Sequence, residues 1–358
     1  MTTSSGNYSY QPQIDPKRII AIWGFSEAAL GGILHALKIP LTGMFVGGAA
    51  VIFITLLAHY SQKKTAILNA AITVIVIKAI ISPHTPLAAY FAVGIQGLLG
   101  YFFFSLIKFQ KIAAILLGFF SLLFSSLQKF IILTIVFGNT FWNSIDDFAN
   151  YILIQLKIDP SYYSLSFSIV LISIYAIIHV SVGIYLALKA VSLPKKVNEK
   201  SYSLAEAFKY YLTEDIFERK ESKKPKRWWK RKSGIILIIF FTLLMILTYF
   251  EPGFEKSRTY EIFIMLVRSF IITFFWFVII SPFLVSKFNK FIEKNKFERA
   301  SEINRATALF PEFKKIINYS WKASANYRNI RRIRKFLSDA IVLLLITKIN
   351  TNERNINL

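Results

Sequence analysis

Residues 19–61 read IIAIWGFSEAALGGILHALKIPLTGMFVGGAAVIFITLLAHYS, two apolar stretches separated by one short turn. A membrane hydrocarbon core about 30 Å thick needs roughly 20 apolar residues for one helical crossing, and each stretch is close to that length. The same pattern recurs along the chain and predicts an all-α polytopic membrane protein. The candidate spans are 19–37, 43–61, 65–83, 88–106, 112–137, 165–189, 233–250 and 260–284.

The charges of the connecting loops predict the orientation of these spans. The chain has 43 basic and 20 acidic residues, and the basic ones gather in every second loop. Basic loops stay in the cytoplasm, so both termini are expected there and the number of spans is expected to be even. We therefore expect a multi-pass protein of the bacterial cytoplasmic (inner) membrane. The first 18 residues lack the apolar core of a signal peptide, which predicts an uncleaved first span.

The spans divide the sequence into two membrane blocks and three polar segments. In the linker between the blocks, Ser203 and Glu206 resemble a capping box, which predicts a short helix over 203–219. In the tail, Pro311 is expected to separate two helices. The apolar run 336–346 is too short to cross and is expected to pack against the protein or lie at the interface. The expected organisation is a cytoplasmic N-terminal tail (1–18), a six-span helical bundle (19–190), a basic cytoplasmic linker (191–232), a two-span hairpin (233–285) and a basic helical cytoplasmic tail (286–358).

Three ionisable residues inside the predicted spans are the first functional candidates, because a charge in a bilayer is costly. Glu27 lies near the middle of the first span, whereas Lys78 and Lys129 lie in the outer parts of the third and fifth spans. Glu27 either pairs with Lys78 or another cation to join helices, or it takes a proton or a ligand. The two lysines either extend towards the interface or form an outward-facing site for an anion.

Other polar residues in or beside the spans have plainer interpretations. Gln96 and His179 are interpreted as groups that form hydrogen bonds between helices, with a functional role as the alternative. Arg268 is intramembrane and ionisable, and it is interpreted as an anchor near the interface. His84, which precedes Thr85 and Pro86, belongs either to a turn or to a ligand site.

Small residues recur every four positions in the first two spans. Ala28, Gly32 and Ala36 follow this spacing in the first span, and Gly43 and Gly47 begin the second. Such faces let helix backbones approach closely, which is a main source of helix association in membranes. The spacing predicts a packing face, either within the chain or against a partner subunit.

Two stretches of the N-terminal block support a family resemblance. Residues 26–60 read SEAALGGILHALKIPLTGMFVGGAAVIFITLLAHY, and residues 66–103 read AILNAAITVIVIKAIISPHTPLAAYFAVGIQGLLGYFF. The small residues four apart, the short proline-containing turn KIPLTG (38–43) and the small-residue-rich third and fourth spans resemble the substrate-binding (S) component of energy-coupling-factor transporters. The resemblance covers about 19–190.

This resemblance implies a cavity that is open to the outside and binds a small solute, with a separate ATPase module as the energising partner. Two lysines in such a cavity would favour an anionic solute. The chain continues well beyond the length of an S component, and its further spans and basic helices suggest a fused coupling module. The lining residues implied are Lys78, His84, Gln96, Gln128, Lys129, Asn139 and Trp142.

Two basic stretches predict further contacts. Clusters of cations and tryptophans beside a span are typical of contact with anionic lipid headgroups. The stretch NIRRIRK (329–335) has three possible partners, namely lipid, a protein or RNA, but no aromatic stacking platform supports a nucleic acid. The cluster before the seventh predicted span consists of Lys223, Lys224, Lys226, Arg227, Trp228, Trp229, Lys230, Arg231 and Lys232.

The sequence argues against an enzyme. Asp146 and Asp147 lack the further acidic residues that a Mg²⁺–diphosphate site uses, and no zinc, phosphate-loop or nucleophile-elbow motif occurs. We therefore expect no metal and no cofactor, and the absence of cysteine removes thiolate sites. Two function classes remain. The first is a membrane component that binds a small anionic solute for transport with a separate energising partner. The alternative is a membrane scaffold or assembly subunit whose basic cytoplasmic helices dock a partner protein.

Overall fold

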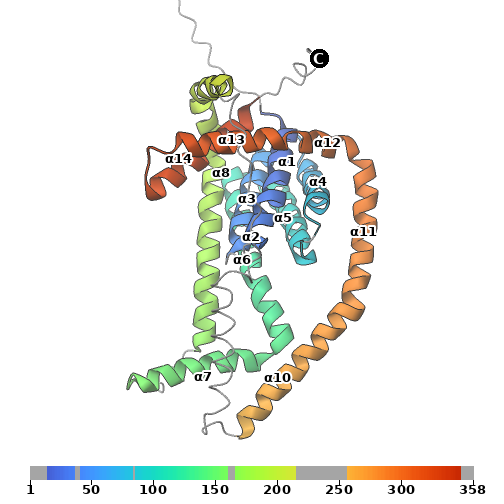
Figure 1. Cartoon of the computed structure of the whole chain (residues 1–358), viewed down its shortest axis with the longest axis vertical. Coiled ribbons are helices and arrows are strands. Elements are labelled where there is room, and N and C mark those ends of the chain that lie inside the picture. Colours follow the sequence, from blue (N-terminus) through green and yellow to red (C-terminus); the bar gives the residue numbers. More distant parts are fainter. Residues whose placement is uncertain (1–13, 37–40, 84, 160–165, 215–255, 348–358) are drawn as a thin grey trace, which may run out of the picture.

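Helices make up all the regular structure that is described. Five of them are long and apolar enough to cross a membrane. No strand occurs in the described ranges. The chain is therefore an all-α, multi-pass membrane protein, as its apolar stretches predict. The predicted span 233–250 lies outside the described residues. The computed structural model (Figure 1) describes residues 14–36, 41–83, 85–159, 166–214 and 256–347.

The N-terminal block forms a bundle of six apolar segments, the first of which is broken into three short helices (Figure 1). Of the apolar window in α3, 61% is buried, so this helix lies in the interior of the bundle. The core around it is made mainly of aliphatic side chains and alanine, with aromatic rings such as Trp23 and Phe53 among them. The bundle elements are α1 (Pro16–Phe25), η1 (Ser26–Leu30), α2 (Gly31–Ala36), α3 (Thr42–Tyr60), α4 (Thr65–Ile81), α5 (Leu87–Leu106), α6 (Gln110–Phe137) and α8 (Phe167–Glu214).

The first segment is not one regular helix. It starts at Pro16, where the Asp15 side chain accepts a hydrogen bond from the Lys17 amide at 2.8 Å. The π-helix η1 then interrupts the α-helical pattern over Ser26–Leu30 and includes Glu27. A π-helical turn inserts an extra residue, changes the direction of the following side chains and is frequent at functional sites.

Helices α6 and α8 pack through glycines. A methyl group added to Gly118 would collide with the Gly183 carbonyl, and one added to Gly183 would collide with the Gly118 carbonyl. The two backbones therefore touch, which only residues without a side chain permit. This contact fixes the position of α6, which also packs against α3 and α5.

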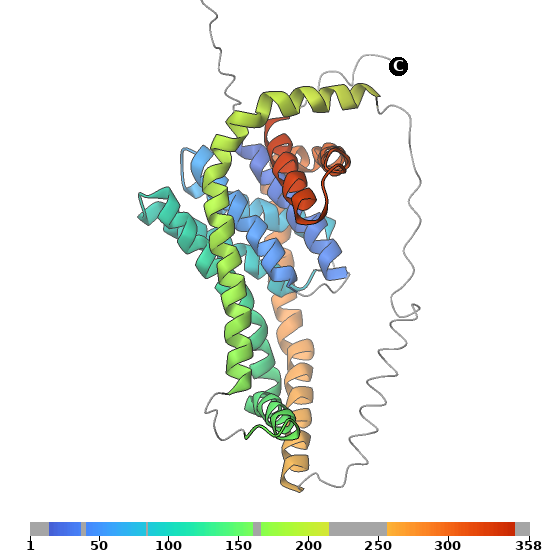
Figure 2. The ribbon, with the colours of Figure 1, turned by 90° about the vertical axis from the view of Figure 1, so that its left-hand side faces the viewer.

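Helix α8 is longer than the sequence predicts. It runs without interruption from Phe167 to Glu214, so the separate helix predicted over 203–219 is wrong. The Ser203 hydroxyl does not cap a helix start but donates to the Lys200 carbonyl one turn earlier. Pro194 lies inside the helix, where it removes one backbone donor, and α8 bends towards its C-terminal end (Figure 2).

The predicted outer loop 138–164 contains a helix that was not predicted. Helix α7 (Asn139–Gln155) lies across the axis of the bundle at the end opposite α12–α14 (Figure 1). Asp146 of α7 accepts a hydrogen bond from the Ser168 amide at 2.6 Å and one from the Ser166 hydroxyl at 2.7 Å. A side chain of α7 therefore caps the start of α8 and joins the two helices.

The C-terminal part forms an arm and a folded tail. The arm consists of α10 (Lys256–Phe275), η4 (Trp276–Ile280) and α11 (Ser281–Glu298), and it stands apart from the bundle along most of its length (Figure 1). None of the apolar window within Phe263–Glu298 is buried against described residues. The helix continues through Pro282 into α11. Pro282 occupies the first turn of α11, where proline is tolerated.

The tail consists of α12 (Ala300–Ala308), α13 (Phe310–Ala323) and α14 (Asn329–Ile346). Pro311 lies in the first turn of α13, so the predicted break near this proline is confirmed. The run 336–346 ends in a buried segment, Val342–Ile346, and its expected packing against the protein is also confirmed. Helices α12 and α13 cross one end of the bundle, which we call the capped end; the end near α7 is the far end (Figures 1 and 2).

Candidate functional site

The first candidate site is a buried ion pair between η1 and α4. The Lys78 ammonium nitrogen lies 2.7 Å from Oε2 of Glu27, and the two side chains are only 2% and 1% exposed. The predicted pairing of Glu27 with Lys78 is therefore confirmed. A buried pair at this distance neutralises both charges and joins the two helices.

One aromatic ring lies beside this pair. The Lys78 nitrogen lies 5.9 Å from the centre of the Tyr90 ring on α5. The Tyr90 hydroxyl donates to the Ser82 carbonyl at 3.1 Å, and its ring lies 4.7 Å from the Phe288 ring on α11. The arm thus contacts the bundle beside the ion pair. Oε1 of Glu27 and Nε1 of Trp23 are buried and find no hydrogen-bond partner among the described residues.

The other residues expected to line a ligand cavity lie in different environments. Gln96 is buried beside Gly47, and its side-chain oxygen has no described hydrogen-bond partner. Lys129 and Asn139 are exposed, and Gln128 is half-buried. Trp142 donates from its indole nitrogen to the Thr134 hydroxyl at 2.9 Å. A ligand role for these residues stays a prediction.

The remaining predicted polar residues divide between buried and exposed positions. His179 is buried, and its Nδ1 lies 2.9 Å from the Tyr175 carbonyl oxygen of the same helix. Arg268 is exposed, and its guanidinium lies against the backbone of Gly138. His84 lies outside the described residues, as does the basic cluster from Lys223 to Lys232.

Members of the small-residue face contact other helices of the same chain. A methyl group on Gly43 would collide with the Ser125 side chain, and one on Gly47 would lie 3.0 Å from Nε2 of Gln96. Ala28 is buried, and a methyl group on Gly32 would meet the Ser82 hydroxyl at 3.5 Å. Ala36 ends α2, and its side chain is not described.

The second candidate site is the interface between the tail and the bundle at the capped end. Arg18 of α1 donates to Glu312 of α13 at 2.9 Å and also to the Leu344 carbonyl of α14. Its guanidinium lies 5.3 Å from the centre of the Phe313 ring. Burial lowers the pKa of Arg18, although the Glu312 carboxylate opposes this change. Arginine stays charged at neutral pH, so the group holds three parts of the chain together.

Aromatic rings and polar bonds extend this interface. The Phe25 ring of α1 packs edge-on against Phe310 and Phe313, with ring centres 5.0 and 5.7 Å apart. Glu302 of α12 accepts a hydrogen bond from Thr73 of α4 at 3.2 Å. On the other side, Tyr319 of α13 packs against Phe208 of α8 at 5.2 Å. The tail therefore contacts α1 and α4, which come early in the sequence of the bundle, and α8, which is its last helix.

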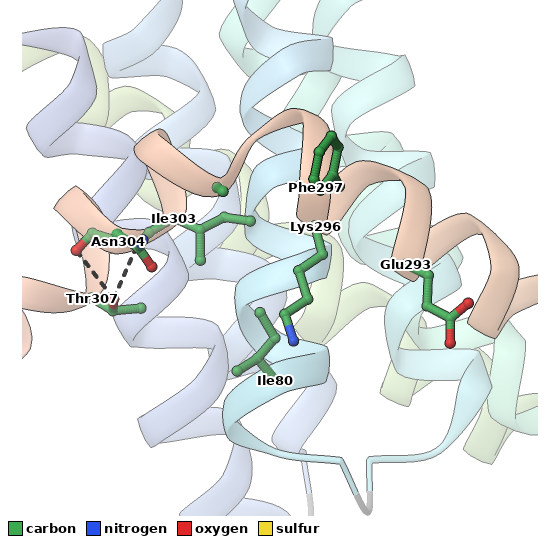
Figure 3. A pocket seen from close by; sticks show the side chains of 8 residues that line it. Ile80, Glu293, Lys296, Phe297, Ile303, Asn304 and Thr307 are labelled. Atoms are coloured by element: carbon green, nitrogen blue, oxygen red, sulfur yellow. Dashed lines mark hydrogen bonds between the residues drawn. The ribbon is translucent and has the colours of Figure 1, made fainter.

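A pocket of about 510 Å³ lies where α11 and α12 pass α4. Figure 3 shows the Lys296 side chain extending along α4 towards Ile80. Phe297 lies beside the pocket and is 88% exposed. An exposed aromatic ring beside a pocket is typical of a surface that receives a partner.

The outer sides of α12 and α13 carry cations. Arg305, Lys314 and Lys315 are exposed, whereas Phe313 and Ile316 on the opposite side of α13 are buried. No ion pair joins these three cations to an acidic group in the described ranges. We call Arg305, Lys314 and Lys315 the tail basic face. The sequence showed that the tail is basic and amphipathic, but it did not show which cations point away from the bundle.

No known family model matches the chain, and no curated protein or solved structure matches it. The resemblance of residues 19–190 to a transporter S component therefore stays a prediction.

Proposed function

We propose that this chain is a membrane assembly subunit whose folded tail docks a partner protein. The single observation that carries this proposal is the set of bonds made by Arg18, which joins α1 to both α13 and α14. A solvated basic tail would need no buried contact of this kind. Because the inner sides of α12 and α13 are fixed on the bundle, the tail basic face is presented in one orientation.

The loop charges support a specific orientation in the membrane. In this proposal, residues 233–250 and 260–284 add two spans to the six-span bundle, and both termini lie in the cytoplasm of a bacterium. The tail basic face then points into the cytoplasm. Its charge suits an acidic surface on a soluble or membrane-bound partner, and the ATPase module of a transporter is one candidate.

Burial of the Glu27–Lys78 pair argues against the alternative, an anion site built from Lys78 and Lys129. Lys78 is neutralised by Glu27, whereas Lys129 is exposed on α6. An anion that bound to Lys78 would have to displace a buried carboxylate at 2.7 Å. The pair therefore supports a rigid bundle more strongly than an anion site.

A charge-reversal experiment tests the docking proposal. The variant Lys314→Glu/Lys315→Glu changes only exposed side chains, so the fold should persist. We expect a stoichiometric partner that co-purifies with the wild-type protein from native membranes to be lost from this variant. The matched control is Lys108→Glu/Lys111→Glu, which reverses two exposed lysines of another basic turn. Equal recovery of the partner with both variants would contradict the proposal.

A solute-binding component is the second candidate, and unpartnered buried atoms favour it. Nε1 of Trp23, Oε1 of Gln96 and Oγ of Ser121 lie on three different bundle helices, and none has a hydrogen-bond partner among the described residues. Buried polar atoms normally have partners, so these three are available to a polar guest. Mass spectrometry of the purified protein under native conditions would detect a retained small molecule. A ligand of uniform mass, lost in Gln96→Leu, would favour this function over docking.

A further inference from the structure

The α13–α14 hairpin exposes a group of large apolar side chains around its turn. Ile330, Ile333 and Leu337 are 80%, 51% and 50% exposed, and their spacing of three and four residues puts them on one side of α14. Trp321 of α13 and Tyr327 of the turn are exposed as well, at 46% and 45%. We call residues 321–337 the hairpin tip.

The hairpin tip has a defined structure although it contributes little to the core. The Arg332 guanidinium lies 4.1 Å above the Trp321 ring, and Trp321 packs edge-on against Phe336 at 5.3 Å. The second half of α14 is buried over Val342–Ile346 and contacts α8 and α13. One half of this helix thus belongs to the core, whereas the other half presents apolar side chains outwards.

Cations alternate with these apolar side chains. Arg328, Arg331 and Arg334 are exposed, and none of them pairs with an acidic group in the described part of the chain. Lys335, by contrast, lies 2.7 Å from Asp339. Positive charge extends onto α8, where Lys189, Lys196 and Lys200 lie near Arg334 of α14, with Glu199 as an acidic neighbour. Asp339 and Glu199 offset only part of this charge, so the local charge is positive.

The position of the hairpin tip indicates which surface it contacts. Helix α14 lies beside α8 at the capped end of the bundle (Figures 1 and 2). The first part of α8 is apolar enough to cross a membrane, so the bilayer surface must pass close to the place where that apolar part ends. Exposed isoleucine, leucine and tryptophan together with arginine is the composition of helices that lie in a lipid interface.

We propose that the hairpin tip binds the surface of a bilayer that contains anionic phospholipids. Ile330, Ile333 and Leu337 enter the boundary between headgroups and acyl chains, and Arg328, Arg331 and Arg334 contact the phosphates. This function goes beyond partner docking and uses different cations, because the tail basic face consists of Arg305, Lys314 and Lys315.

The chain contains no cysteine, so a single introduced cysteine reports one position without further changes. We would label Ile330→Cys with an environment-sensitive fluorophore and place the protein in nanodiscs of phosphatidylcholine alone or mixed with phosphatidylglycerol. Lipids that carry a quencher at the top of the acyl chain then measure contact with the bilayer. We expect strong quenching in the mixed nanodiscs and weaker quenching in phosphatidylcholine alone. A label at the exposed Ser301 of α12 is the control and should stay unquenched in both.

Neutralising the cations separates the lipid contact from docking. Three cations beside an anionic surface favour the bound state roughly a hundredfold in total. The variant Arg328→Gln/Arg331→Gln/Arg334→Gln should therefore lose the additional quenching that phosphatidylglycerol causes. The matched variant Arg305→Gln/Lys314→Gln/Lys315→Gln should keep it. A label at position 330 that remains in water in both nanodiscs would overturn the proposal. Shielding of that label by an added protein partner alone would assign the hairpin tip to protein docking instead.

Discussion

Lys78 of α4 and Glu27 of η1 form an ion pair of 2.7 Å in which neither side chain reaches the surface. Removing one partner leaves a buried charge without compensation, which typically costs about 3–5 kcal/mol. We expect Lys78→Met to lower the midpoint of thermal unfolding in detergent by roughly 10 °C. Lys129→Met makes the same chemical change at an exposed position and should have little effect. The double variant Glu27→Leu/Lys78→Met should recover most of the loss, and a double variant no better than Lys78→Met would refute the pairing argument.

The glycine contact between α6 and α8 predicts a sharp steric effect. Gly118→Ala places a methyl group on the Gly183 carbonyl, so the two helices must separate. We expect a loss of about 1–3 kcal/mol, seen as a lower thermal midpoint and poorer expression. Gly94→Ala is the control, because the nearest atom to its methyl group would be the Ile75 side chain at an ordinary 3.8 Å. Similar midpoints for both variants would show that α6 and α8 do not touch at this point.

Arg18 should control whether the tail stays on the bundle. Arg18→Ala removes the bonds to Glu312 and to the Leu344 carbonyl, so α12–α14 should exchange backbone hydrogens faster than in the wild-type protein. Hydrogen–deuterium exchange with mass spectrometry measures this directly. Lys17→Ala changes the neighbouring exposed cation and should leave exchange in the tail unchanged. The swapped pair Arg18→Glu/Glu312→Arg should restore part of the protection, and equal protection in Arg18→Ala and the wild type would count against the interface.

The cap that Asp146 provides for α8 should weaken in acid. Burial alone would raise the pKa of Asp146, but the hydrogen bonds from Ser168 and Ser166 lower it below its ordinary value. A depressed folded-state pKa adds stability above the unfolded value of about 4, and this stability is lost as the pH falls through the folded value. A spin label at Asn143→Cys should therefore become more mobile below about pH 4. In Asp146→Ala the label should be mobile at every pH, and a pH response that survives this substitution would assign the titration to another group.

The helical architecture and the buried Glu27–Lys78 ion pair were predictable from the sequence. Both follow from the high free energy of an unpaired polar or charged group in lipid. An apolar stretch of sufficient length must be a helix in lipid, and a charge near the bilayer centre needs a partner. The environment of Lys129 was not predictable. Its exposure depends on how α6 turns around its contact with α8, which involves Gly118 and Gly183 far apart in the sequence. Their similar depth in the predicted spans grouped Lys129 with Lys78, and the resemblance then implied that both line one cavity.

Of the other differences, only α7 has a local cause that the sequence contained. The apolar residues Phe141, Ile145, Phe148 and Ile152 recur with helical spacing in the predicted loop 138–164, so α7 could have been found from this pattern. The continuation of α8 past Pro194 is different, because tertiary contacts with α14 outweigh the missing backbone bond. The contact between Arg18 and Glu312 spans almost the whole chain, and no periodicity indicates it.

The α13–α14 pair ties the first and last segments of the bundle together at one end only. Arg18 binds it to α1, while Lys200 approaches Asp339 at 4.0 Å and Phe208 packs on Tyr319 to bind it to α8. Any separation of α1 from α8 must therefore be smallest at this end and grow with distance from it. A widening of the bundle would take the form of a wedge that opens beside α7.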